Sequence, residues 1–247
     1  MNLKVISTGS KEGNCYVIQT PQKYLLLDCG CDFKKILEGI GYAIENVSVC
    51  LATHKHSDHI HEPTKMHQNG IPIYTNDETK EHFMTNSGER LLGLRENTRV
   101  CIGPFTVIPF YVPHDGTPNF AYLIMLPNGQ KLLYATDFQY LPYTFKSFKI
   151  AHFLIECNHM DGAISSENAA YSHYVHSIRG HSSLSTAKEI IHENATESLK
   201  TVTLCHMSDT YSDPETMVRE VKSVTGPFVN VQAARSGLTI NLDDCPF

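Results

Sequence analysis

The sequence predicts an α/β fold in which two mixed sheets pack face to face with helices outside them, a four-layer αβ/βα sandwich. Three observations predict it. The first segments are β-rich and joined by short turns, later strand-like segments alternate with helical ones, and polar residues that can bind metals follow several strands. A length of 247 residues suits one large domain of this kind, so we expect a single domain over residues 1–247.

Apolar runs bounded by turn residues predict the strands, and apolar residues at helical spacing predict the helices. In the first half, the predicted strands cover residues 3–8, 14–20, 23–28, 47–52 and 71–74, and the predicted helices cover 32–41, a segment ending near 68 and one from 77. In the second half, strands are expected at 105–112, 119–126, 130–136, 151–156, 201–205, 228–231 and 237–241, and helices at 166–178, 183–197 and 214–224. Hairpins therefore come first and β/α units follow.

The composition is that of a soluble globular protein, with 41% hydrophobic residues. No stretch approaches the ~20 apolar residues of a membrane-spanning helix, and the N-terminus lacks the apolar core and cleavage site of a signal peptide. The eight cysteines are scattered without a Cys-x-x-Cys pair. We therefore expect reduced thiols, a cytoplasmic location, no membrane partner and no structural zinc knuckle.

The formal net charge of −6 disfavours tight nonspecific binding to nucleic acid, which depends on neutralising phosphates with basic side chains. It does not exclude a nucleic-acid substrate, because bound divalent cations add positive charge at the site itself. Arg90, Arg95 and Arg99 form the one basic cluster of interest, and solvation at the surface is its more ordinary explanation.

Residues 53–59, here called the motif loop, read Thr-His-Lys-His-Ser-Asp-His and follow a buried strand. In an extended segment, the spacing of His54 and His56 points both rings the same way. Asp58 and His59 follow where we expect a helix to begin. Three imidazoles and a carboxylate can bind two borderline-hard cations, with His54 and His56 on one and Asp58 and His59 on the other.

Further ligands are expected at the ends of later strands. His114 follows the strand 105–112 and can complete the first set, Asp137 follows the run 131–135 and can bridge both cations, and His206 follows the strand 201–205 and can complete the second set. A sheet edge holds such ligands rigidly. We expect His61, His67 and His82 to be surface or supporting groups, and His173, His176 and His192 to be ordinary residues of helix surfaces.

The order of these motifs resembles that of the metallo-β-lactamase superfamily: a His-x-His-x-Asp-His motif, a single His, a bridging Asp and a final His. The resemblance covers essentially the whole chain. The segment around Asp28 resembles the family's Asp-x-Gly turn, which implies an orienting role for Asp28 beside the metal ligands, and a plain turn-forming aspartate is the alternative. The residue His56 departs from the glutamate of the flavo-diiron redox branch.

Four segments resemble the YycJ/WalJ-type branch, described as metal-dependent exonucleases on DNA: the loop from Thr8 to Asn14, the stretch Glu156–His159, the segment 179–185, and His206–Asp209 with a downstream Pro-Glu. The Gly-His-Ser segment also resembles tRNase Z and the cyclic phosphodiesterases. This resemblance implies that His181, expected at the start of a helix, protonates the leaving oxygen. A helix-capping histidine is the alternative, and Ser182 departs from the apolar residue of the family pattern.

The resulting hypothesis is a dinuclear-metal phosphodiesterase of the 5'-3' exonuclease type that acts on DNA or RNA. Two divalent metal ions, zinc, manganese or iron, would activate a water. Asp58 and His181 are the expected catalytic residues, and His181 and Asn158 the expected substrate contacts. The alternatives are a hydrolase of a small carbonyl ester, thioester or lactone, a cyclic phosphodiesterase, and a metal-binding module without activity. The oligomeric state is left open.

Overall fold

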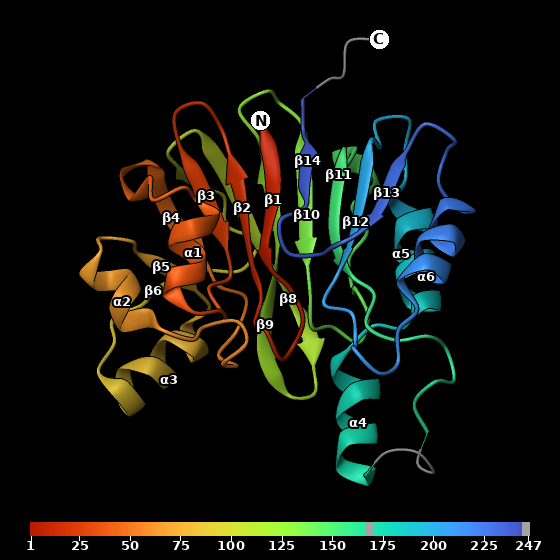
Figure 1. Cartoon of the computed structure of the whole chain (residues 1–247), viewed down its shortest axis with the longest axis horizontal. Coiled ribbons are helices and arrows are strands. Elements are labelled where there is room, and N and C mark those ends of the chain that lie inside the picture. Colours follow the sequence, from red (N-terminus) through yellow and green to blue (C-terminus); the bar gives the residue numbers. More distant parts are fainter. Residues whose placement is uncertain (166–169, 244–247) are drawn as a thin grey trace. The chain divides into compact units, whose positions relative to one another are not determined.

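A computed structural model describes residues 1–165 and 170–243 of the chain. The chain divides into two compact units, one made of Met1–Pro109 with the C-terminal segment from Arg235, the other of Phe110–Ala234. Because this division leaves the single-domain expectation untested, that expectation stays a prediction. The predicted fold class is confirmed: the protein is α/β with two mixed sheets (Figure 1).

The first unit contains one complete sheet with the strand order β14-β1-β2-β3-β4-β5-β6. Its elements are β1 (Asn2–Ser7), β2 (Cys15–Gln19), β3 (Tyr24–Leu27), α1 (Phe33–Gly39), β4 (Val47–Leu51), α2 (Pro63–Gln68), β5 (Ile73–Thr75), α3 (Asp77–Ser87), β6 (Leu92–Gly93), β7 (Val100–Ile102) and β14 (Thr239–Asn241). The hairpins β1–β2–β3 and the pair β1–β14 are antiparallel, whereas β3, β4, β5 and β6 run parallel. Strand β14 therefore returns the C-terminal segment beside β1 (Figure 1).

The second sheet has the order β13-β12-β11-β10-β9-β8-β7, and β8 carries the chain from the first unit into the second. Its further elements are β8 (Phe105–His114), β9 (Thr117–Met125), β10 (Lys131–Ala135), β11 (His152–Glu156), α4 (Tyr171–Gly180), α5 (Leu184–Asn194), β12 (Thr201–Cys205), α6 (Pro214–Lys222) and β13 (Asn230–Ala233). Strands β10 to β13 are parallel, so their carboxyl ends share one edge. Short 3-10 helices lie at Ile44–Asn46 and Lys146–Phe148.

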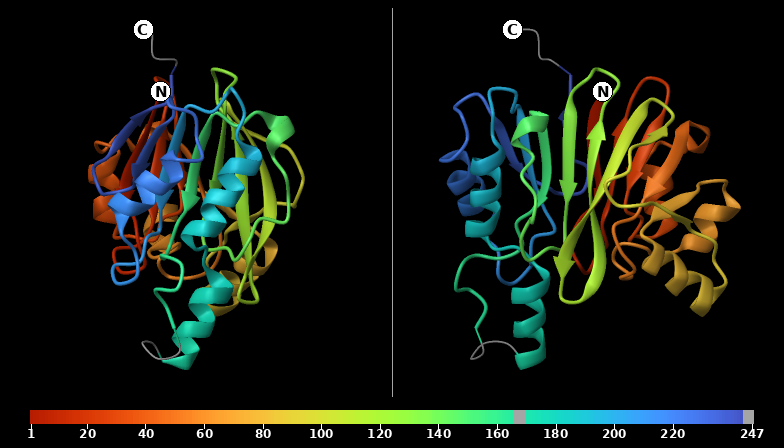
Figure 2. Two further views of the ribbon diagram at one scale, coloured as in Figure 1. Left: turned by 90° about the vertical axis from the view of Figure 1, so that its right-hand side faces the viewer. Right: turned by 180° about the vertical axis from the view of Figure 1, so that it is seen from behind.

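The interior of the second unit is built on its parallel strands. All five residues of β11 and all five of β12 are buried, as expected of strands covered on both faces. Helix α5 turns Leu184, Ala187 and Ile191 inward and packs on β11, and α6 lies beside it (Figure 2). Burial of such apolar side chains stabilises the strands by roughly 1.5–3 kcal/mol for each large residue.

Three expected helix starts differ from the structure. Residues after Asp58 form a turn, and α2 begins only at Pro63, which suits the first helical position because it has no amide hydrogen to satisfy. The predicted segment 166–178 corresponds to α4, whose first four predicted residues lie outside the described part of the chain. Helix α4 runs on to Gly180, so His181 follows the end of one helix and does not begin the next.

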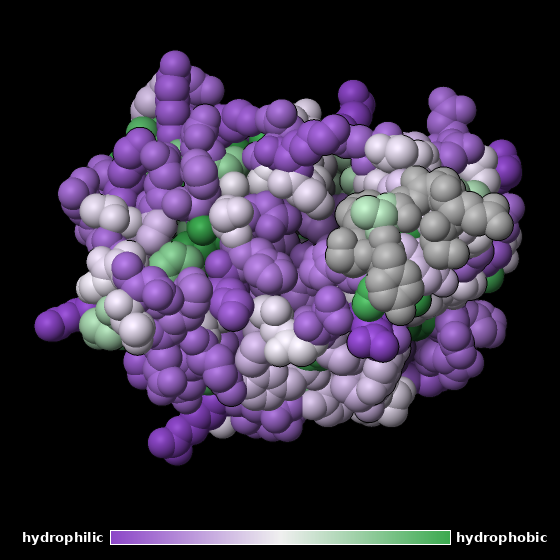
Figure 3. Space-filling view, turned by 90° about the horizontal axis from the view of Figure 1, so that it is seen from below, coloured by the Kyte–Doolittle hydropathy of each residue, from purple (hydrophilic) through white to green (hydrophobic). Residues whose placement is uncertain are grey.

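The surface carries few large hydrophobic side chains. The face drawn in Figure 3 is mostly hydrophilic, with hydrophobic residues confined to small patches. Within the ranges described, no helix is both long and apolar enough to cross a membrane. Arg90, Arg95 and Arg99 are exposed, which agrees with solvation at the surface as their ordinary state.

Candidate metal centre

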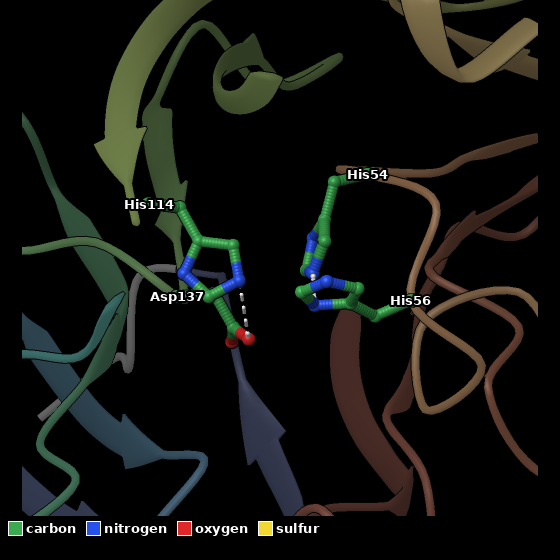
Figure 4. Close-up of side chains that lie close together, drawn as sticks. All are labelled: His54, His56, His114 and Asp137. Atoms are coloured by element: carbon green, nitrogen blue, oxygen red, sulfur yellow. Dashed lines mark hydrogen bonds and ion pairs between the residues drawn. The ribbon is translucent and has the colours of Figure 1, made fainter. Parts of the chain in front are cut away.

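The motif loop brings its two leading histidines together. His54 and His56 follow β4, and His54 Nε2 lies 2.9 Å from His56 Nδ1 (Figure 4). Two imidazole nitrogens on one tetrahedral cation with ~2.1 Å bonds lie roughly 3.4 Å apart, so this approach is near the spacing of two ligands of one ion. The His54 ring is fully buried, and its centroid is 4.3 Å from that of His59.

Asp28 anchors the motif loop from the end of β3. Its Oδ1 accepts a hydrogen bond from the Thr53 amide at 2.7 Å, and its Oδ2 accepts from Thr53 Oγ1 at 3.2 Å and from His59 Nδ1 at 2.7 Å. Because a carboxylate only accepts, His59 carries its proton on Nδ1 when neutral, and its Nε2 then has the lone pair that a metal needs. Asp28 thus orients Thr53 and His59, at a backbone φ of 56°, and its role beside metal ligands stays a prediction.

Asp58 and His59 lie side by side at the end of the motif loop. Asp58 Oδ2 is 3.4 Å from His59 Nε2, and the buried amide of Asn14 lies 3.5 Å from the same carboxylate oxygen. Asn14 also donates to the Asp58 carbonyl at 3.2 Å. The opening loop, which was noted only for its family likeness, therefore positions Asp58.

Close backbone packing holds these loops in place, and it requires glycine. A Cβ on Gly30 would lie 1.8 Å from the Asp58 carbonyl oxygen, and a Cβ on Gly13 would lie 1.9 Å from the Gly30 carbonyl oxygen. The amide of Asn14 donates to the Asp58 carbonyl at 2.8 Å, and the amide of Gly30 donates to the Asn14 carbonyl at 2.9 Å. Backbone hydrogen bonds and close backbone contacts thus join the three segments and fix the motif loop.

In the second unit, His114 ends β8 and is buried. Its Nδ1 donates to the Gly180 carbonyl oxygen at 2.7 Å, which leaves Nε2 as the unprotonated nitrogen of the neutral ring. Burial lowers the pKa of His114, against the opposing effect of Asp137, and so favours this neutral form. His114 Nε2 lies 3.8 Å from Asp137 Oδ2 (Figure 4).

Asp137 and His206 follow the parallel strands β10 and β12, both with left-handed backbone at φ 54° and 50°. Such a conformation costs of order 1 kcal/mol or more for a residue with a Cβ, so neighbouring contacts must enforce it. The buried Asn119 amide donates to the Asp137 carbonyl at 2.6 Å, and the buried Asn158 amide donates to the His206 carbonyl at 2.8 Å. His206 Nδ1 lies 3.4 Å from Asp137 Oδ1.

Glu156, at the end of β11, is a fully buried carboxylate between two histidines. Its Oε1 accepts hydrogen bonds from His181 Nδ1 at 2.8 Å and from His206 Nδ1 at 2.9 Å, and its Oε2 accepts from the amides of Ser182 at 2.9 Å and Phe138 at 3.3 Å. Desolvation alone would raise the pKa of Glu156, but the charge and hydrogen bonds of the histidines outweigh it and lower that pKa to about 2.

His181 is held by this carboxylate beside His206. Desolvation opposes its charged form, yet the neighbouring Glu156 carboxylate raises the pKa of His181 overall. The rings of His181 and His206 stack with centroids 5.2 Å apart. Ligand atoms of Asp137, Glu156, His181 and His206 all lie within 4.8 Å of one another, so this unit by itself gathers mixed imidazole and carboxylate donors.

The predicted substrate contact Asn158 is 6% exposed, and its amide is placed on His206. It therefore positions His206, and its contact with a substrate stays a prediction. Glu156 and Asn119 were assigned no role from the sequence. Glu156 carried a usable signal, because it ends a buried strand as Asp137 and His206 do.

The other histidines divide into two groups. His61, His67 and His82 have partners of their own, respectively Asp32, Glu89 and Asn86. His176 bonds Asp115 at 3.1 Å, and its ring centroid lies 5.7 Å from that of His114 and 5.4 Å from that of His181, so it contacts the site in addition to solvent. The His173 side chain lies outside the described residues.

Comparison with known proteins extends these observations. The family model described as a beta-lactamase superfamily domain matches residues 23–207. The exodeoxyribonuclease WalJ of Streptococcus pneumoniae is 27% identical over 97% of this chain and 90% of its own length. The exodeoxyribonuclease YycJ of Bacillus anthracis is 29% identical over 64% of this chain and 63% of its own. A solved metallo-beta-lactamase fold protein of Bacillus subtilis, YhfI, superimposes with a TM-score of 0.75 at 22% identity, covering 97% of this chain and 98% of its own. The resemblance inferred from the motifs is thereby confirmed.

Proposed function

We propose that this chain is a dinuclear-metal phosphodiesterase which degrades DNA as an exonuclease. The premise is that the chain belongs to the β-lactamase superfamily and is a metal-dependent hydrolase. The observation that carries the phosphodiesterase assignment is the bond between Glu156 and His181, 2.8 Å from Oε1 to Nδ1. A phosphodiester has a poor alkoxide leaving group that needs a proton in the transition state. A histidine held in its protonated form supplies that proton.

The proposed ligands are the metal-binding residues predicted from the sequence. We assign His54, His56 and His114 to one cation, Asp58, His59 and His206 to the second, and Asp137 to both. The donor chemistry supports the assignment, because Nε2 of His59 and of His114 is the unprotonated nitrogen in each neutral ring. A mixed imidazole and carboxylate set suits zinc, manganese or iron. When bound, such a pair of cations lowers the pKa of a water and draws charge from the phosphoryl oxygens.

The chain's own groups then have distinct tasks. His181 donates its Nε2 proton to the departing oxygen while its Nδ1 stays bonded to Glu156. Glu156 keeps the ring oriented and favours its charged form, and the burial of this carboxylate strengthens that effect. Asp58 orients the attacking water and accepts its proton, and Asn158 positions His206. A general acid contributes about 10²–10⁴ to the rate.

DNA is the substrate we favour. Two relatives from Streptococcus pneumoniae carry the name exodeoxyribonuclease and align with nearly the whole chain. The net charge of −6 indicates that the protein binds the DNA phosphates only weakly outside the metal site. We therefore expect a shallow dependence of KM on salt, with a log–log slope equivalent to only a few phosphate contacts.

The test is a panel assay with protein loaded with manganese or zinc. The panel contains bis(4-nitrophenyl) phosphate, end-labelled single- and double-stranded DNA, RNA, and a thioester and a lactone. Asp58→Ala serves as the blank. Stepwise release of mononucleotides from DNA supports the proposal, whereas turnover of the carbonyl substrates alone refutes it.

His181→Ala separates the two kinds of hydrolase. For phosphodiester cleavage we expect kcat to fall about 10²–10⁴-fold, with less effect on substrates that have a nitrophenolate leaving group, because that group departs without a proton. The matched control is His192→Ala, an exposed histidine on α5. Equal rates for His181→Ala and wild-type protein on DNA would contradict the assigned role.

A further inference from the structure

A cavity of about 390 Å³ lies in the second unit next to His181, between the segment that follows β10, the loop after β11, and α5. We call it the His159 cavity. Its lining includes Gln139, Tyr140, His159, Asp161 and His181. The volume is at the lower end of the range for small-molecule sites and is sufficient for a nucleoside. Of these five residues, only His181 has been assigned a role above.

His159 is the unusual member of this lining. Its side chain is 4% exposed, and its Nδ1 has no hydrogen-bond partner among the described residues. The backbone around it is fixed, since the Leu184 amide donates to the His159 carbonyl at 2.9 Å and His159 forms a bridge with Ser183. The His159 ring itself lines the cavity, so a ligand there lies against it. Burial lowers the pKa of His159, so the ring is neutral.

The carboxylate of Asp161 disfavours an anion at its end of the cavity. Asp161 already occupies the N-terminus of α5, where its carboxylate accepts from the Ser185 amide at 3.1 Å and from the Ser185 hydroxyl at 2.5 Å. Desolvation would raise the pKa of Asp161, but the hydrogen bonds from Ser185 and Ser183 outweigh it and lower that pKa. A phosphate at this helix end would meet a fixed negative charge. An occupant that offers hydrogen-bond donors, as the edge of a nucleobase does, fits beside Asp161.

Tyr140 supplies a flat apolar surface at the same place. Its side chain is 53% exposed, and it lines both the His159 cavity and an adjoining cavity of about 480 Å³. An exposed aromatic ring beside unsatisfied polar groups is the combination on which nucleobases stack. Gln139, also exposed, can both donate to and accept from the edge of a base.

We propose that the His159 cavity binds the nucleobase of the leaving nucleoside, with Tyr140 stacked on the base and His159 and Asp161 bonded to its edge. The inference rests on the proposed function, because it is His181 that places the departing oxygen beside this cavity. In this arrangement Tyr140 and His159 recognise the base. The base lies beside Asp161, and its phosphate remains outside, away from that carboxylate.

The kinetic test compares pairs of short DNA substrates that differ only at the leaving nucleoside, which carries either a base or a tetrahydrofuran abasic site. Loss of one stacked base costs on the order of 5–150-fold in affinity. We therefore expect wild-type kcat/KM to favour the base-bearing substrate by about 10-fold or more. Tyr140→Ala should bring this ratio towards one, and Tyr140→Phe should keep it.

Phe228→Ala is the matched control, because Phe228 is a 92% exposed aromatic residue of the same unit outside the cavity. His159→Leu is the second variant and should lower the ratio for base-bearing substrates while sparing the abasic ones. If Leu does not fit at this buried position and the protein fails to fold, Tyr140→Ala, at an exposed position, still decides the question.

Saturation-transfer NMR with free adenosine and with ribose gives a readout independent of turnover. We expect adenosine to bind the wild-type holoprotein, Tyr140→Ala to lose that binding, and ribose to bind neither. Adenosine binding through Tyr140 without cleavage of any phosphodiester would overturn the proposed function and support the cavity assignment. Cleavage of DNA with an unchanged base-to-abasic ratio in Tyr140→Ala would overturn the cavity assignment alone.

Discussion

The substitution Glu156→Gln tests the central carboxylate with the smallest change in shape. The Glu156 side chain accepts four hydrogen bonds, two from imidazoles on Oε1 and two from backbone amides on Oε2. A glutamine side chain has one accepting oxygen and one NH2 group. The NH2 group must therefore face either the two imidazole N–H donors or the two backbone N–H donors. Each buried donor left unpaired costs about 1–3 kcal/mol, which gives an expected loss of stability of roughly 2–5 kcal/mol.

The charge contributes a second, pH-dependent effect. Folding lowers the pKa of Glu156 from 4.5 to about 2. A depressed carboxyl pKa contributes stability that is fully present above the unfolded pKa and is lost as the pH falls towards the folded one. At ~1.4 kcal/mol per pKa unit, this shift is worth on the order of 3 kcal/mol. Metal-free wild-type protein should therefore lose stability between about pH 4.5 and pH 2 more steeply than Glu156→Gln.

Urea denaturation of the metal-free proteins at a series of pH values measures both effects, and NMR titration of the His181 imidazole measures the lowered pKa expected in the variant. Glu189→Gln, a neutralised exposed glutamate on α5, is the control. A free energy of unfolding within about 0.5 kcal/mol of wild type at pH 7, together with an unchanged His181 titration, would refute the reasoning.

Three further predictions concern the support of the motif loop and the burial of the thiols. Asp28→Asn should weaken metal binding about 10–100-fold, because the NH2 group of the asparagine would face a hydrogen-bond donor of the motif loop. Competition with a chelator measures the metal affinity, and an unchanged affinity would exclude the supporting role of Asp28. Gly30→Ala should destabilise the protein by more than about 3 kcal/mol in urea, since its Cβ would lie 1.8 Å from a carbonyl oxygen, whereas Gly226→Ala, whose Cβ meets nothing closer than 4.0 Å, should be near neutral. In a Cys245→Ser background, a maleimide should label native protein once, at the exposed Cys101, because the other described thiols are buried; a second rapid adduct would contradict that burial.

The sequence was informative about the site wherever a buried strand ends in a polar residue. That pattern singled out His114, Asp137 and His206, which lie close together in the structure, because strands that run in the same direction have their carboxyl ends at one edge of a sheet. The same rule applies to Glu156 after β11, although the sequence alone could not tell whether that carboxylate contacts a metal or supports histidines. Only the fold brings Ser182 and Phe138 to its second oxygen.

Contacts between distant segments explain what the sequence did not predict. Helix α4 continues to Gly180 because that residue packs against His114, where a Cβ would lie 3.0 Å from the ring. His181 therefore adopts an extended backbone after the helix, and the cap of α5 falls to Ser183, which accepts from the Thr186 amide. Local propensity favoured a helix start at the Gly-His-Ser segment, and tertiary packing moved it by several residues.

The site residues of both units are held in the same way, by buried hydrogen-bond partners at strand ends. Three residues with left-handed backbone, Asp28, Asp137 and His206, stand at strand ends, and each is a carboxylate or imidazole held through its own buried partners. Strain and buried charge of this kind lower stability, so they persist only where surrounding contacts enforce them. Each unit enforces its own share: Asp28 fixes the rings that follow β4, and Glu156 with two buried asparagines fixes those that follow the parallel strands. Because these side chains are already oriented by their own buried partners, the chain meets most of their ordering cost during folding and not when a ligand binds.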